Sequence, residues 1–205
     1  MKSLLVILDN GHGDDTPGKR SPVWKDGSQL FEYEFNREVV NLIALELTAY
    51  ENHGIYCTRL VPELHDVSLS QRVVRANNIV KAARAQGDET LLISVHGNAG
   101  KGTGWEVFTT VGKTKSDLFA ESIALSAIAH FGERFPVRRD MEDGDLDKES
   151  NFYILKNSIG PAVLTENLFM DTWKDCKYMM STEGKRVLAK IHVEAILDYF
   201  KSLNK

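Results

Sequence analysis

Hydrophobic positions along the chain form short apolar runs that alternate with stretches of helical periodicity. The runs predict strands at 4–8, 55–59, 91–95, 105–109, 152–155 and 162–165. Helical spacing predicts a helix over 35–47 that Gly54 stops, one from the Ser68–Gln71 capping box to about 85, and others over 116–131, 174–180 and 184–203. Alternating strands and helices are typical of α/β proteins. We expect a twisted, mainly parallel sheet of about six strands, flanked by helices on both faces.

Composition narrows the class of protein. The 205 residues, 42% hydrophobic and 26% charged, suit one folded domain, and we expect 1–205 to be a single catalytic domain. A net charge of -4 argues against binding to nucleic acid. Cys57 and Cys176 lie far apart and outside any CxxC pair, which favours free thiols.

The N-terminal apolar run resembles the start of a signal peptide but is too short for one. Polar residues follow directly from Asp9, which favours a buried strand at 4–8. We therefore expect synthesis in the cytoplasm without a signal peptide, and no apolar run is long enough for membrane insertion.

Polar side chains stand where predicted elements begin or end. His12, His96 and Glu166 each follow a strand, and Glu32 precedes the first long helix. Ligands of open α/β sheets bind beyond the carboxyl ends of the strands, so these side chains can converge. Two histidines and one carboxylate can bind a catalytic zinc ion, with a second carboxylate to move a proton. Each residue could instead have a purely structural role. His12 could lie in a turn and His96 in the core, while Glu32 could be a charge at a helix start and Glu166 a buried carboxylate.

Six segments in sequence order resemble motifs of the zinc-dependent N-acetylmuramoyl-L-alanine amidases, the type 3 amidase family. The family's motifs D-x-G-H-G, E-x-x-x-N, T-R…L-x-x-R-x-x-x-A-N, S-x-H-x-N-A, G-x-E-V and P-A-V-L-x-E match Asp9–Gly13, Glu32–Asn36, Thr58–Asn77, Ser94–Ala99, Gly104–Val107 and Pro161–Glu166. One departure follows the last motif, where the family often has Gly-Phe and this chain has Asn167-Leu168-Phe169.

The resemblance implies an activity and a set of site residues. It implies hydrolysis of the amide between N-acetylmuramic acid and L-alanine in bacterial peptidoglycan, with one zinc ion per chain. The metal ligands would be His12, Glu32 and His96, and the catalytic residue would be Glu166. Without a signal peptide, the chain is more similar to a phage or prophage endolysin, which reaches the cell wall at lysis, than to an exported housekeeping member of the family.

Three further residues are candidates for supporting roles. Asp9 could hold a metal-bound histidine by a hydrogen bond, or cap the loop. Asn98 and Arg139 are candidates for binding substrate. Other functions remain open: a zinc carboxypeptidase acting on stem peptides, a non-catalytic wall-binding domain, or a regulatory α/β domain without metal.

Overall fold

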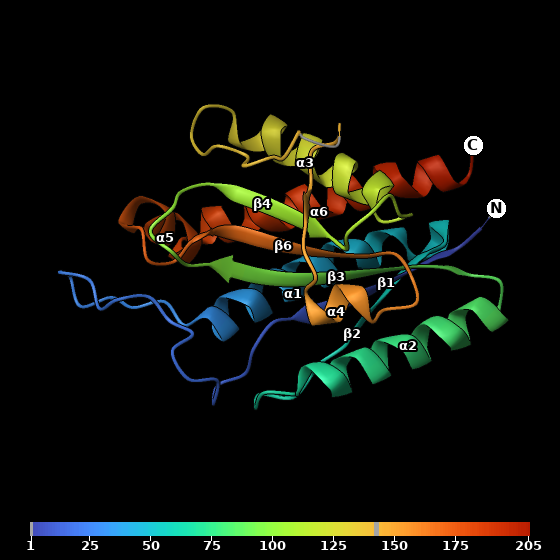
Figure 1. Ribbon diagram of the computed structural model, residues 1–205, viewed down its shortest axis with the longest axis horizontal. Coiled ribbons are helices and arrows are strands. Elements are labelled where there is room, and N and C mark those ends of the chain that lie inside the picture. Colours follow the sequence, from blue (N-terminus) through green and yellow to red (C-terminus); the bar gives the residue numbers. More distant parts are fainter. Residues whose placement is uncertain (1, 142–143) are drawn as a thin grey trace.

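A six-stranded sheet forms the centre of the computed structural model, which describes residues 2–141 and 144–205 (Figure 1). The strands lie in the order β2-β1-β3-β6-β4-β5. Neighbouring strands are parallel except for β4 and β6, which are antiparallel. Their bounds are β1 Leu4–Asn10, β2 Ile55–Arg59, β3 Glu89–Asn98, β4 Trp105–Thr109, β5 Lys148–Glu149 and β6 Ala162–Phe169.

Helices cover both faces of this sheet, as the sequence predicts. On one face lie α1 (Glu32–Leu47), α3 (Asp117–Phe131) and α6 (Thr182–Leu203), with α5 (Trp173–Met180) packed against α6. On the other face lie α2 (Leu69–Ala85) and the short α4 (Tyr153–Lys156), in front in Figure 1. A larger hydrophobic core fills the first interface and a smaller one the second. The α/β class and the mainly parallel sheet are therefore confirmed.

The helix boundaries follow local signals in the sequence. Ser68 is the N-cap of α2, and its hydroxyl accepts a hydrogen bond from the backbone amide of Gln71. Beyond α1, a 3-10 helix, η1 (Thr48–His53), ends at Gly54, whose φ of 86° is left-handed.

One predicted strand is wrong. The segment predicted at 152–155 instead forms the N-cap and first three residues of α4, in which Ile154 and Leu155 are buried against α2 and β6. A run of four apolar residues fits a buried helical turn as well as a strand, so the pattern alone does not decide. The remaining strand of the sheet is instead β5, two residues long and in a polar segment.

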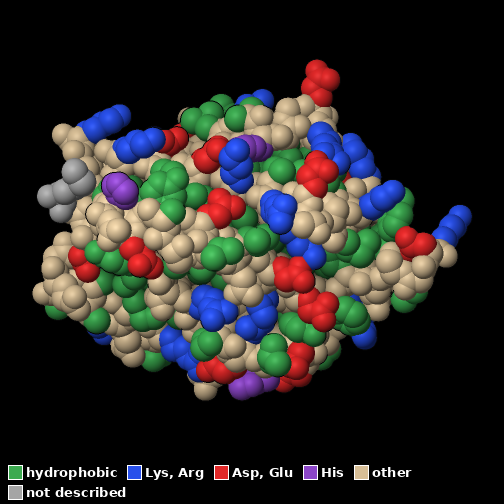
Figure 2. Space-filling view, turned by 180° about the vertical axis from the view of Figure 1, so that it is seen from behind, with side chains coloured by type: hydrophobic (Ala, Val, Ile, Leu, Met, Phe, Trp, Pro, Cys, Tyr) green, Lys and Arg blue, Asp and Glu red, His purple; other side chains and the backbone are tan. Residues whose placement is uncertain are grey.

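The two ends of the chain lie together, away from the carboxyl ends of β1, β3 and β6 (Figure 1). The backbone amide of Lys2 donates to the Asn204 side chain over 2.8 Å. The face seen in Figure 2 mixes acidic and basic side chains. Among the described residues, none of the helices is long and apolar enough to span a bilayer.

Candidate functional site

A row of polar residues crosses three strands at the carboxyl end of β3. His96 of β3 pairs in register with Glu166 of β6, which in turn pairs with Glu106 of β4. Residues in register on neighbouring strands point to the same face of a sheet. We call His96, Glu166 and Glu106 the polar row; it adds Glu106 to the predicted convergence of His96 and Glu166.

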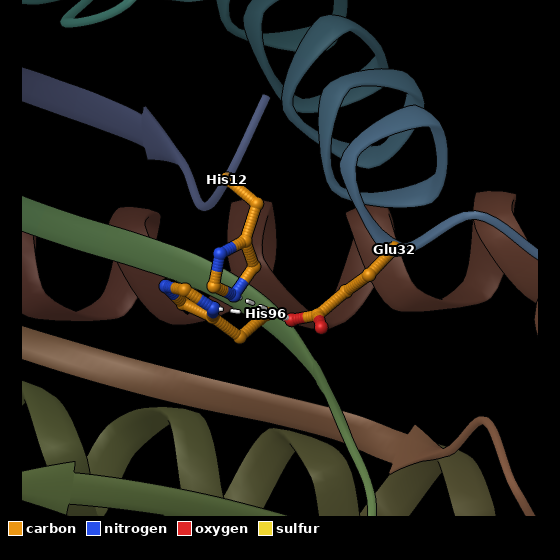
Figure 3. Close-up of side chains that lie close together, drawn as sticks. All are labelled: His12, Glu32 and His96. Carbon is orange, nitrogen blue, oxygen red and sulfur yellow. Dashed lines mark hydrogen bonds and ion pairs between the residues drawn. The ribbon is translucent and has the colours of Figure 1, made fainter. Parts of the chain in front are cut away.

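His12 and Glu32 reach His96 from a loop and a helix start. Figure 3 shows the three side chains pointing toward one another, from the loop after β1, the first residue of α1 and β3. The Glu32 carboxylate lies 3.3 Å from His12 Nε2 and 3.2 Å from His96 Nδ1. One ligand atom from each residue lies within 4.8 Å of the others. The structure thus brings together the three predicted ligands.

Burial and charge within this trio oppose each other. Burial alone would raise the pKa of Glu32, but hydrogen bonds from His12 and His96 outweigh it and lower the pKa far below its ordinary value. For His96, burial would lower the pKa, while the bond to Glu32 and the charges of Glu166 and Asp9 raise it. Glu32 is therefore ionised at neutral pH, which is the form in which a carboxylate binds a metal ion.

The position of His12 depends on its neighbours in the chain. Its φ of 67° is left-handed, a conformation that non-glycine residues rarely adopt. Asn36, one turn after Glu32 on α1, donates to the carbonyl of Gly11 over 3.0 Å. A Cβ atom on Gly11 would come within 2.0 Å of the His96 ring, so only glycine fits there. Packing and hydrogen bonding around His12 thus account for Gly11 in the D-x-G-H-G motif and for Asn36 in the E-x-x-x-N motif.

A buried hydrogen-bond chain supports His96 from the far side. Ser94 Oγ lies 3.2 Å from His96 Nε2 and donates to Asp9 over 2.6 Å. The guanidinium of Arg72 donates to the other Asp9 oxygen over 2.5 Å. Arg72 also donates to the carbonyls of Asn10 and His12. Asp9 therefore contacts His96 through Ser94 rather than directly. Both Asp9 and Ser94 belong to the sequence motifs, but the motifs do not predict this contact.

Glu166 occupies the centre of the polar row. Burial, together with the negative charges of Glu32 and Glu106, raises the pKa of its carboxyl group to about 7, although the charge of His96 acts in the opposite direction. Its Oε2 atom is buried and has no hydrogen-bond partner among the described residues. A carboxyl group with a pKa near neutrality can both accept and return a proton. Two residues on, Leu168 has a left-handed φ of 71°, a conformation that favours glycine.

Glu106 is the centre of a charged cluster that the sequence does not predict. Its carboxylate accepts hydrogen bonds from Arg138 Nε over 2.7 Å, Lys148 Nζ over 2.5 Å and Asn98 Nδ2 over 2.6 Å. These partners outweigh its burial and lower the pKa of Glu106. We call Asn98, Glu106, Arg138 and Lys148 the Glu106 cluster. Asn98 is thus at the site, while Arg139 is exposed next to Arg138.

A cavity opens in front of the trio. Its volume is about 380 Å³, and it reaches from His12, His96 and Glu166 toward apolar side chains of α2 and α4. Lys19 lies at its edge, with its ammonium group 3.7 Å from Glu32. A substrate in this cavity would contact His12, His96 and Glu166 together.

Two histidines and a carboxylate beside a glutamate of raised pKa are typical of metal-dependent hydrolases on α/β folds. Comparison with known proteins gives the family. A family model described as N-acetylmuramoyl-L-alanine amidase matches residues 6–198. The chain therefore belongs to the N-acetylmuramoyl-L-alanine amidase family, and the prediction of an amidase of this family is confirmed.

Individual relatives agree with this family. The chain is 27% identical to the sporulation-specific N-acetylmuramoyl-L-alanine amidase of Bacillus subtilis (strain 168), covering 96% of this chain and 68% of that protein. It is 28% identical to the endolysin of Bacillus phage SPP1, covering 96% of this chain and 66% of that protein. The crystal structure of an N-acetylmuramoyl-L-alanine amidase from Clostridium difficile 630 has the same fold, with a TM-score of 0.79, 24% identity and coverage of 98% and 99%.

Proposed function

We propose that this amidase is zinc-dependent and hydrolyses the amide between N-acetylmuramic acid and L-alanine of peptidoglycan. The observation that supports this most directly is the convergence of His12, Glu32 and His96 within 4.8 Å beside Glu166. We also propose that residues 1–205 act as one catalytic domain, since a single sheet runs through the described residues.

The donor set and its burial fit one zinc ion per chain. Imidazole nitrogens and a carboxylate oxygen are ordinary zinc ligands, and three of them leave a position open for water. Glu32 Oε2 is buried without a hydrogen-bond partner among the described residues, and Lys19 Nζ lies 3.7 Å from it. Buried polar atoms without partners are costly, and a bound cation would remove that cost.

Bound zinc would lower the pKa of water and polarise the carbonyl group of the scissile amide. Glu166, with its pKa of about 7, would accept the proton from the attacking water and return it to the departing alanine nitrogen. His96 would keep its orientation through Ser94, which Asp9 and Arg72 hold in turn. The cavity beside α2 and α4 would exclude bulk water from one side of the scissile bond.

The relatives' names support peptidoglycan as the substrate and the cell wall as the place of action. One relative is named an endolysin, and we propose that this chain, made in the cytoplasm, reaches the wall at lysis. Among the alternatives, a stem-peptide carboxypeptidase would use the same metal ligands, so the product distinguishes the two functions.

Zinc content and reaction products test the proposal. The purified protein should contain about one zinc per chain and release whole stem peptides from peptidoglycan, as measured by mass spectrometry. Release of single terminal residues would indicate the carboxypeptidase. Binding to the wall without any release would indicate a non-catalytic domain, and a protein that folds and acts without metal would exclude the zinc proposal.

A further inference from the structure

The Glu106 cluster contains two cations and one carboxylate, directly beside the polar row. Arg138 and Lys148 both donate to Glu106, while Asn98 contributes no charge. The cluster therefore retains one net positive charge next to Glu166. Arg138 is 42% exposed and Lys148 is 26% exposed, so a ligand in solution can reach both.

Among the described residues, the guanidinium of Arg138 is held by a hydrogen bond at Nε alone. Its Nε donates to Glu106, and its Cζ atom lies 5.2 Å from the centre of the Phe169 ring. The backbone amide of Arg138 donates to the Trp105 carbonyl over 2.8 Å. No partner of its two Nη groups is found among residues 2–141 and 144–205. A guanidinium held at Nε presents both Nη groups as a fork that matches a carboxylate.

The spacing of the strands places this fork at a defined distance from the reaction centre. Neighbouring strands lie about 4.8 Å apart, so Glu106 lies one strand beyond Glu166, on the side away from His96. Successive Cα atoms of a peptide lie about 3.8 Å apart. With the scissile amide over Glu166, the residue after the alanine can reach the Glu106 cluster.

We infer that Arg138 and Lys148 bind the carboxylate of the stem peptide that lies nearest to the scissile amide. This inference rests on the proposed function, and it makes the free carboxylate a determinant of specificity. A carboxamide at the same place is neutral and turns N–H donors toward two cations, so it binds less well. Lys148 adds charge, and Arg138 adds the paired hydrogen bonds.

A pair of small substrates tests the inference. The zinc-loaded protein is given N-acetylmuramoyl-L-alanyl-D-isoglutamate and its isoglutamine counterpart, and kcat/KM is measured for each. A hydrogen bond between charged groups is worth about tenfold or more in affinity. We expect the free acid to be preferred by at least about that factor, mainly through KM, and the Arg138→Gln variant to lose the preference.

Three further variants test whether the preference for the free acid depends on Arg138 itself. Arg138→Lys should retain part of the preference, since it keeps the charge without the fork. Arg139→Gln removes the neighbouring exposed arginine and should leave the preference in place. Arg186→Gln, at an exposed position of α6, is the matched control for basal activity.

The outcomes separate this inference from the function on which it rests. Equal cleavage of both substrates by the wild-type protein would overturn the inference and leave the amidase function standing. The inference would also fail if Arg139→Gln, and not Arg138→Gln, removed the preference. Failure of the zinc-loaded protein to cleave peptidoglycan itself would count against the proposed function instead.

Discussion

Arg72 and Arg138 each bind a carboxylate beside the polar row, yet their other donors differ. Arg72 is 2% exposed, and all five of its N–H groups donate, to Val67, Asp9, Asn10, His12 and Asp66. Arg138 is 42% exposed and has one hydrogen bond from its guanidinium among the described residues. A saturated, buried cation can only fix the positions of its neighbours, whereas an unsaturated one can also bind a ligand.

The largest effect should come from Glu166, which lies between the two arginines and belongs to the chemistry. Glu166→Gln should keep the fold and the zinc but lose about a hundred- to ten-thousandfold in kcat, the usual contribution of a general acid or base. By contrast, His12→Ala should lose zinc and activity together. Metal content, melting temperature and stem-peptide release are measured for each variant.

The exposed Glu133→Gln variant is the matched control for the loss of one carboxylate. Near-normal turnover in Glu166→Gln would remove Glu166 from catalysis. Loss of zinc in that variant would make it a ligand and would reopen the assignment of Glu32.

The arginine comparison itself predicts a difference in stability. Arg72→Met leaves Asp9 buried and unpaired, and breaking a buried pair in this way costs about 3–5 kcal/mol. Arg138→Met leaves Glu106 paired with Lys148, and removing a half-exposed ion pair costs less than about 1 kcal/mol. Urea denaturation of both variants measures the two free energies of unfolding. Similar losses of stability in the two variants would contradict the different roles assigned to Arg72 and Arg138.

His192 is another buried side chain whose polar atoms all have hydrogen-bond partners, and it extends the comparison to the pH dependence of stability. The imidazole is buried, with Nδ1 2.7 Å from the Leu188 carbonyl and Nε2 3.0 Å from Thr165 Oγ1. Burial lowers the pKa of His192 to about 4 from its ordinary value of 6.5. The folded state therefore disfavours the protonated form, so this contribution to stability is complete above pH 6.5 and is lost as the pH falls toward 4.

Comparison with His192→Gln isolates this effect, because the raised pKa of Glu166 acts in the opposite sense over part of the same range. On going from pH 7 to pH 4.5, the zinc-free wild-type protein should lose about 2.5 kcal/mol more than the variant. The exposed His53→Gln variant should follow the wild type. Parallel curves for all three proteins would show that His192 does not titrate as its burial predicts.

The smallest of these effects concerns the hydrogen-bond chain behind His96. Ser94→Ala should keep the fold but weaken zinc binding by about 10- to 100-fold, the usual cost of removing a group that orients a metal-binding histidine. Competition with a chelator measures the affinity. Ser126→Ala on α3 removes a hydroxyl with no partner among the described residues and is the matched control. Unchanged zinc affinity in Ser94→Ala would leave Asp9 with a purely structural role.

How much the sequence predicts depends on the range of each interaction. Long apolar runs and helical periodicity predict the central strands and the long helices, because burial on both faces leaves a clear pattern. The four-residue α4 and the two-residue β5 are too short to have one. Ligation by His12, Glu32 and His96 is predicted from motif resemblance, and the structure adds their convergence. The Glu106 cluster depends on strand register and on a loop that returns from far along the chain, which no local pattern contains.

The hydrogen bond between Lys2 and Asn204 has a practical consequence. Lys2 and Asn204 lie near the amino ends of the central strands, opposite the cavity, so a support or fusion partner attached at either end would leave the cavity open. The same closeness makes a circular permutant feasible, with the old ends joined by a short linker and new ends in an exposed loop. In an immobilised form of the enzyme, the cavity would thus stay accessible to a polymeric substrate.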